Sequence, residues 1–155
     1  MKRFVAVLAA PFLLVTPSRA QWWFSGQAGV SAWRDNVALD VPYGHVSCHS
    51  RSVACVDGAV GISWGIGHVY DLAEADVLLD LPAGRKVFVA PRVGVSTVTI
   101  NDRTNLNGFN ASIALWRRTA SDHTVRVDAV YRHFPGYKWY SFDVGVQGPL
   151  KDEGT

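Results

Sequence analysis

Apolar residues alternate with polar or small residues at a period of two through most of this sequence. Between positions 87 and 97, one face of the segment would carry Val87, Val89, Pro91, Val93 and Val95, and the other Ala90, Arg92, Gly94 and Ser96. A period of two belongs to a β-strand, whereas a helix repeats every 3.6 residues. The same alternation predicts further strands over 24–32, 60–67, 73–81, 109–115, 125–132 and 140–147. The chain is therefore expected to be all-β.

An eighth and weaker strand is predicted over Val37–Gly44, where Pro42 favours an edge or an irregular strand. The wider stretch from Arg34 to Asp57 otherwise resembles a long irregular segment. Further loops are expected at Asn101–Gly108 and Pro135–Lys138, because these segments are rich in turn-forming residues.

The first twenty residues have the order of a secretory signal peptide. Lys2 and Arg3 precede an apolar run from 4 to 15, and the small residues Ser18 and Ala20 fit a cleavage site. A dozen apolar residues are too few to cross roughly 30 Å of hydrocarbon as a helix. We expect residues 1–20 to be removed and residues 21–155 to form a single domain.

The remaining domain is nearly neutral. Loss of Lys2, Arg3 and Arg19 lowers the number of basic side chains from 15 to 12, against 13 acidic ones. This balance gives no basic surface of the kind that nucleic acids require. No nucleic-acid partner is expected.

Cys48 and Cys55 are the only two cysteines. In an exported protein they are expected to form a disulfide that closes a short loop. A metal site is the alternative, because His45 and His49 flank Cys48. The spacing matches no common zinc motif, so the disulfide is preferred and no metal or other cofactor is expected.

The polar face of the strands indicates which side of the sheet faces inward. It combines repeated glycine with acidic and arginine residues, a mixture that suits the crowded interior of a narrow barrel. Lysine, which is common on exposed sheets, occurs in the mature region only at positions 86, 138 and 151. The expected lumen charge lattice consists of Glu74, Asp76, Arg92, Arg126, Asp128, Arg132 and Asp143. The aliphatic face would then meet lipid, as in a membrane barrel.

Aromatic residues near the strand ends suggest interfacial girdles on the outside of such a barrel. The residues concerned are Trp22, Trp23, Phe24, Trp33, Tyr70, Phe88, Phe109, Trp116, Tyr131, Phe134, Trp139 and Tyr140. Trp116 is an exception, because strict alternation places it on the polar face.

The stretches 87–95, 124–134 and 140–146 resemble the closing strands of small outer-membrane β-barrel proteins. In that family, charged residues alternate with apolar ones before a last strand with the pattern apolar-x-apolar-Gly-apolar, here Phe142-Asp-Val-Gly-Val. The resemblance implies an up-and-down antiparallel barrel of eight strands in the outer membrane. Family members typically end on an aromatic residue, whereas this chain continues from Pro149 to Thr155.

Arg132-His133-Phe134 occupies a place similar to the active-site region of outer-membrane lipid A deacylases. Those enzymes carry His-x-Ser-Asn, but Pro135 and Gly136 follow here, so the nucleophile is missing. Glu74 and Asp76 share the inner face and could form a paired-carboxylate site, but a salt-bridge lattice is preferred because buried charges require partners. No enzymatic activity and no catalytic residue are expected.

The sequence thus predicts an outer-membrane barrel with a structural or surface-interaction role. Its expected partners are membrane lipid and extracellular ligands reached through the loops at Asp35–Asp57, Asn101–Gly108 and Pro135–Lys138. Two alternatives remain open: a soluble periplasmic, lipocalin-like carrier of a small apolar ligand, whose aliphatic face would line a pocket, and a degenerate deacylase-like barrel.

Overall fold

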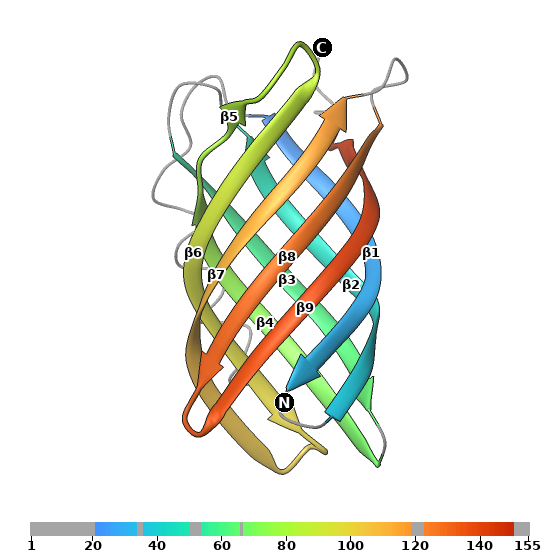
Figure 1. Cartoon of the computed structure of the whole chain (residues 1–155), viewed down its shortest axis with the longest axis vertical. Coiled ribbons are helices and arrows are strands. Elements are labelled where there is room, and N and C mark those ends of the chain that lie inside the picture. Colours follow the sequence, from blue (N-terminus) through green and yellow to red (C-terminus); the bar gives the residue numbers. More distant parts are fainter. Residues whose placement is uncertain (1–20, 34–35, 50–53, 66, 119–122, 151–155) are drawn as a thin grey trace.

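A computed structural model describes residues 21–33, 36–49, 54–65, 67–118 and 123–150, and the predicted signal peptide lies outside these ranges. Every regular element in this part of the chain is a strand (Figure 1). The strands are β1 (Gln21–Trp33), β2 (Asn36–His49), β3 (Cys55–Gly65), β4 (His68–Leu78), β5 (Leu81–Pro82), β6 (Val87–Ile100), β7 (Thr104–Arg118), β8 (Thr124–Phe134) and β9 (Tyr137–Pro149). None of the described residues forms a helix long and apolar enough to cross a membrane.

The eight long strands close into an up-and-down antiparallel barrel. Neighbours along the chain pair with each other, β1 pairs with β9, and β4 pairs with β6. The two-residue β5 adds only a short pairing to β6 in the connection between β4 and β6. The predicted all-β class, the antiparallel barrel and its eight strands are confirmed.

The start of β1 and the end of β9 lie at the same end of the barrel, where Trp23 is paired with Pro149. We call this the terminus end; it is the upper end of the barrel in Figure 1, where strand β1 begins and strand β9 finishes. The β2–β3, β4–β6 and β7–β8 connections also lie there. The opposite end carries the β1–β2, β3–β4, β6–β7 and β8–β9 turns, and we call it the turn end.

The alternation of the strands points the aliphatic face outward. Val93 is 62% exposed and Ile113 is 56% exposed, whereas Arg92 is 3% exposed and Arg126 is 1% exposed. Because a water-soluble barrel would enclose its aliphatic residues, this arrangement contradicts the soluble carrier with an aliphatic pocket. It is the arrangement of a barrel with an apolar surround and a polar interior.

Strand β2 is longer than predicted and contains a bulge. Its register against both neighbours shifts between Asp40 and Tyr43, so that β2 has one more residue there than β1 and β3. Ala38 and Asp40 are buried before the bulge, and His45 and Ser47 after it, so the inward positions change from even to odd numbers. Proline is tolerated at such a bulge, and Pro42 lies within this one. The weaker strand predicted over Val37–Gly44 lies within β2, and β2 continues to His49, so this described part of the expected irregular stretch is strand.

The turn end has very short connections. The expected loop at Asn101–Gly108 shrinks to a turn of three residues, because β6 ends at Ile100 and β7 begins at Thr104. Asn101 and Asp102 have positive φ angles of 48° and 56°, and Arg103 N donates a hydrogen bond of 3.0 Å to Ile100 O. Positive φ at both central residues matches the twist of a tight hairpin. The expected loop at Pro135–Lys138 is likewise only Pro135-Gly136.

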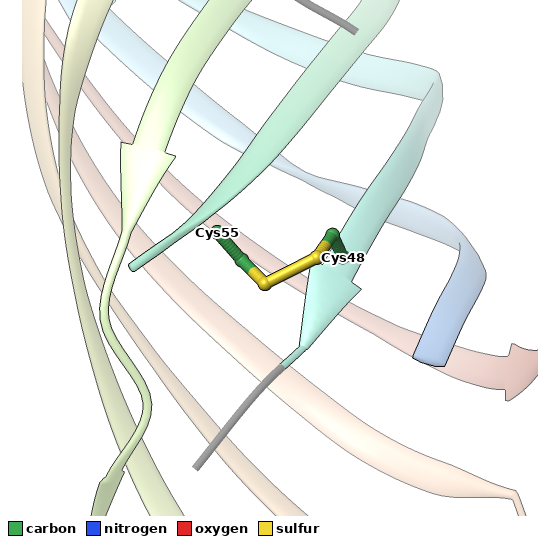
Figure 2. The surroundings of a disulfide bond; sticks show 2 residues. All are labelled: Cys48 and Cys55. Carbon is green, nitrogen blue, oxygen red and sulfur yellow. A yellow bond between two sulfur atoms is a disulfide. The ribbon is translucent and has the colours of Figure 1, made fainter. Parts of the chain in front are cut away.

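Cys48 and Cys55 form the predicted disulfide, and the metal interpretation of these cysteines is therefore wrong. The bond joins the end of β2 to the start of β3 at the terminus end, and the two Cα atoms are 5.3 Å apart (Figure 2). Both cysteines are buried together with Leu78 of β4. The disulfide thus fixes one hairpin connection of the barrel.

Candidate functional site

The most distinctive chemistry of the molecule lies in the middle of the lumen. Arg92 of β6 and Arg126 of β8 each contact Asp57 of β3 and Asp128 of β8. Arg92 Nη2 lies 2.5 Å from Asp128 Oδ1, and Arg126 Nε lies 2.7 Å from Asp128 Oδ2. Two cations and two anions therefore neutralise each other away from water, in the bonding geometry that arginine favours with carboxylates. We call these four residues the central network.

Two further side chains extend the central network toward β1 and β2. Gln27 Nε2 donates to Asp128 Oδ2 at 2.5 Å, and His45 Nδ1 lies 3.3 Å from Asp57 Oδ2. Both residues are buried. The network thus has members on β1, β2, β3, β6 and β8, strands from all around the barrel.

A second cluster lies nearer the turn end. Arg132 Nε donates to Glu74 Oε1 at 2.6 Å, and Arg132 also contacts Ser141. Ser96 Oγ donates to the same Glu74 oxygen at 2.8 Å, and Asn110 Nδ2 donates to Ser96 Oγ at 2.9 Å. Glu74 is thus bound by groups from β6, β7 and β8, which is how a buried carboxylate is stabilised.

The structure places all seven residues of the expected lattice in the lumen, but not in one connected group. Asp76 lies 4.0 Å from Arg92 Nη1, at the limit of an ion pair. Asp143 is buried beside Asp128 in the register of β8 and β9, and its Oδ1 has no hydrogen-bond partner among the described residues. The paired-carboxylate interpretation of Glu74 and Asp76 finds no support, since Glu74 is engaged by Arg132.

Sequence reasoning missed Asp57, which contacts both arginines of the central network. Its signal was present, because Asp57 alternates with Ala59, Gly61 and Ser63 on the small-residue face of the same strand. The residue was instead assigned to an irregular segment. Alternation within β1 also places Gln27 on the inward face with Ser25 and Ser31. Its bond to Asp128 could not be predicted, because it depends on which strands face each other across the lumen.

Aromatic side chains close the lumen near both ends. At the terminus end, Phe88 stacks on Trp116 with 4.2 Å between ring centroids, and Trp116 Nε1 donates to Asp80 at 3.2 Å. At the turn end, Trp33 stacks on Trp139 at 4.4 Å, and Tyr70 meets Trp139 edge-on at 5.0 Å. Such stacked and edge-on pairs are the favoured aromatic geometries.

The predicted outer girdle is therefore only partly correct. Several of its expected members are buried inside the barrel: Trp23, Trp33, Tyr70, Phe88, Trp116, Phe134 and Trp139. Phe24, Phe109 and Tyr140 do face outward. The inward group lies at strand ends because the charged networks occupy the middle of the lumen.

His133 lies on the outer face near the turn end. Its ring stacks on Phe109 at 5.1 Å between centroids, and its Nδ1 lies 3.4 Å from the hydroxyl oxygen of Tyr131. The residues that follow it form the Pro135-Gly136 turn. This is an aromatic cluster with one imidazole, and its described contacts include no serine or other nucleophile.

No protein-family model matches this sequence, and no curated protein matches it. The structure is nevertheless similar to solved outer-membrane proteins. Neisserial surface protein A (NspA) matches with a TM-score of 0.69 and 7% identity, over 84% of this chain and 99% of that one. The N-terminal β-barrel domain of Pseudomonas aeruginosa OprF matches with a TM-score of 0.65 and 11% identity, over 85% and 100% of the two chains.

The outer membrane enzyme PagL also matches, with a TM-score of 0.55 and 15% identity, over 81% of this chain and 99% of that one. A fold of this kind can therefore carry an enzyme, but the fold alone does not decide whether a chain is one. The closed topology, the inward charges and these matches together show that the chain has the eight-stranded β-barrel fold of small outer-membrane proteins.

Proposed function

We propose that this protein is an outer-membrane barrel with a structural role, whose lumen does not conduct ions. The observation that carries the proposal is the central network, in which Arg92 and Arg126 join Asp57 and Asp128 across the lumen. At this level of the lumen the arginines and carboxylates of the central network are bound to each other and not to a passing ion. The aromatic layers at the two ends narrow the path further.

The outer surface supports insertion into a bilayer. Outward positions in the middle of the strands are aliphatic, among them Val93, Val95, Ile113 and Val144. The long strands have 11 to 15 residues, enough for tilted strands that cross a membrane. Burial of this surface in lipid removes apolar area from water, which is the main driving force for insertion.

Surface interactions through the loops, as predicted from the sequence, receive less support. The two fully described hairpin turns of the turn end, at Asn101–Arg103 and Pro135-Gly136, are too short to form a binding surface of their own. Contacts with lipid or with other membrane proteins would instead involve the outer faces of the strands. We therefore place any interaction role on the barrel wall.

An enzymatic role is the second candidate, because PagL shares the fold. His133 would have to act as a base, yet it stacks on Phe109 and precedes a Pro-Gly turn. A positioned nucleophile next to the base is the geometric requirement for acyl transfer. The absence of lipopolysaccharide deacylation by the purified barrel would agree with a non-enzymatic role, and deacylation lost in His133→Ala would contradict it.

Location and conductance can be tested separately. Fractionation of expressing cells should place a heat-modifiable band in the detergent-extracted outer membrane, and release by osmotic shock would contradict membrane insertion.

Conductance is measured in a planar bilayer, where the refolded protein should give no unitary current steps. The matched variant replaces the central network and also Glu74 and Arg132 by serine, so that neither charged cluster crosses the lumen, and small current steps are expected from it. Steps of equal size in the wild type would overturn the sealed lumen.

A further inference from the structure

The lumen contains a cavity at the turn end that the charged networks leave unfilled. Its volume is about 240 Å³, and Trp33, Tyr70, Phe134 and Trp139 form much of its wall. Arg132, which is paired with the lining residue Trp139 across β8 and β9, forms an ion pair with Glu74. The charged cluster around Glu74 therefore begins next to this space, and we call the space the vestibule.

The wall of this vestibule has no formally charged side chain. Besides the aromatic residues, its lining consists of Val98, Ile100 and Leu106 with Asn36, His68 and Tyr137. A charged guest would lose its hydration without gaining a counter-ion there, which is costly. The lining thus favours an uncharged guest.

Asn101 joins His68 to the start of β4. Val69 N donates to Asn101 Oδ1 at 2.8 Å, which fixes the orientation of that amide. The other end of the amide, Nδ2, lies 3.0 Å from His68 Nδ1. The imidazole is thus held at the rim of the cavity by the β6–β7 turn.

One polar atom of the wall lacks a partner. Trp139 Nε1 is buried, and among the described residues no acceptor binds it. An indole N–H can only donate a hydrogen bond. A buried donor without an acceptor raises the free energy of the folded state, because the group has lost its hydrogen bonds to water. Aromatic rings surround this donor: Trp33 and Trp139 are stacked, and Tyr70 meets Trp33 edge-on. They offer apolar contacts to an aromatic guest.

We propose that the vestibule binds a small uncharged aromatic molecule that carries a hydrogen-bond acceptor, such as an aryl ketone, ester or ether. The ring packs among Trp33, Tyr70 and Phe134, and the acceptor receives the N–H of Trp139. The volume is below the roughly 300–1,000 Å³ of pockets for drug-sized ligands, so the guest is smaller than these. This inference goes beyond the structural role proposed above, since a barrel can be sealed with or without a guest in its vestibule.

Acetophenone is a suitable probe, because it combines one ring with one carbonyl acceptor. The refolded barrel in detergent micelles, with ¹⁵N-labelled tryptophan, has six indole N–H signals to follow by NMR. A saturable downfield shift of the Trp139 signal is expected on titration. Ethylbenzene, which lacks the acceptor, is expected to bind roughly five- to tenfold more weakly, the worth of one neutral hydrogen bond.

Trp64 gives an internal control for partitioning of the probe into the micelle. It faces outward on β3 near the same end of the barrel and is 49% exposed. Its indole signal should move little and without saturation. If the Trp139 and Trp64 signals move in parallel, the probe only dissolves in the micelle and the proposal is wrong.

Two variants test the cavity and the Trp139 N–H donor independently of each other. Val98→Phe fills the vestibule and should weaken acetophenone binding at least tenfold, as observed through the Trp33 signal. Trp139→Phe keeps a ring but removes the N–H, so acetophenone and ethylbenzene should then bind equally. Unchanged discrimination between the two probes in Trp139→Phe would overturn the assignment of the donor, and unchanged affinity in a folded Val98→Phe barrel would overturn the site.

Discussion

Arg92 on β6 and Asp128 on β8 are joined across the lumen at 2.5 Å, although β7 lies between their strands in the sheet. The bond therefore does not arise from cross-strand pairing on the barrel wall. It requires that both side chains turn into an enclosed interior. Side-chain contacts in the interior of this barrel thus connect strands that are not hydrogen-bonded neighbours in the sheet.

The Glu74–Arg132 pair gives the first test of this interior. Arg132→Met alone leaves Glu74 without its cation, and we expect a loss of about 3 kcal/mol or more in the free energy of unfolding. The double variant Glu74→Gln with Arg132→Met should recover much of this loss, since no uncompensated charge then remains. Urea unfolding in lipid vesicles, followed by the heat-modifiable band, measures both values.

Lys138→Met serves as the control, because Lys138 is exposed at the start of β9. Its effect should stay within about 0.5 kcal/mol. Equal stabilities of Arg132→Met and Lys138→Met would show that the lumen pair does not contribute as described.

The outer face can be tested with two valines of nearly equal exposure, Val93 at 62% and Val37 at 63%. Val93 lies in the middle of β6, while Val37 lies one residue from the start of β2 at the turn end. In a bilayer, Val93→Arg should cost about 2–4 kcal/mol and Val37→Arg no more than about 1 kcal/mol, because the penalty falls toward the interface. Unfolding in vesicles measures the difference. Two equally tolerated arginines would mean that water surrounds the barrel.

The disulfide at the terminus end constrains only the short connection between β2 and β3, with a sequence separation of 7 between its cysteines. Replacement of both Cys48 and Cys55 by serine should lower the free energy of unfolding by about 2–3 kcal/mol on the chain-entropy model. Reduction of the wild type should cause a similar loss in the same urea assay. A stability unchanged by either treatment would show that the rest of the barrel already holds this hairpin.

Much of the barrel could be predicted because the side-chain period of a strand is local information. The inward positions of Arg92, Arg126 and Asp128 follow from alternation within one strand each. Alternation failed at β2, where one extra residue at the bulge near Pro42 changes which positions face inward. The alternation is regular on each side of the bulge but out of phase by one residue, so a single period predicted a strand only over Val37–Gly44 and not to its end at His49.

The candidate site was harder to predict, because it depends on which strands meet across the lumen. Trp33, Tyr70 and Trp139 come from β1, β4 and β9, and nothing local to any of them indicates an inward cluster. Aromatic residues near strand ends are typical of outer girdles, so that rule placed them on the wrong face. The vestibule beside them follows only from three-dimensional packing.

Gly94 of β6 illustrates how closely the wall of so narrow a barrel is packed. A Cβ atom built there would lie 2.7 Å from the Cα of Asp76 on the paired strand β4, and it would also collide with the backbone oxygen of Ala75. Backbone atoms cannot give way as a flexible side chain would, so Gly94→Ala should lower the free energy of unfolding by about 1–3 kcal/mol.

Gly26 of β1 is the matched control, since a Cβ there meets nothing within 4 Å. Gly26→Ala should be neutral or more stable by up to about 1 kcal/mol, because alanine restricts the unfolded chain. Urea unfolding of the two variants in vesicles measures this contrast, and a Gly94→Ala barrel as stable as Gly26→Ala would show that β4 and β6 do not approach each other so closely.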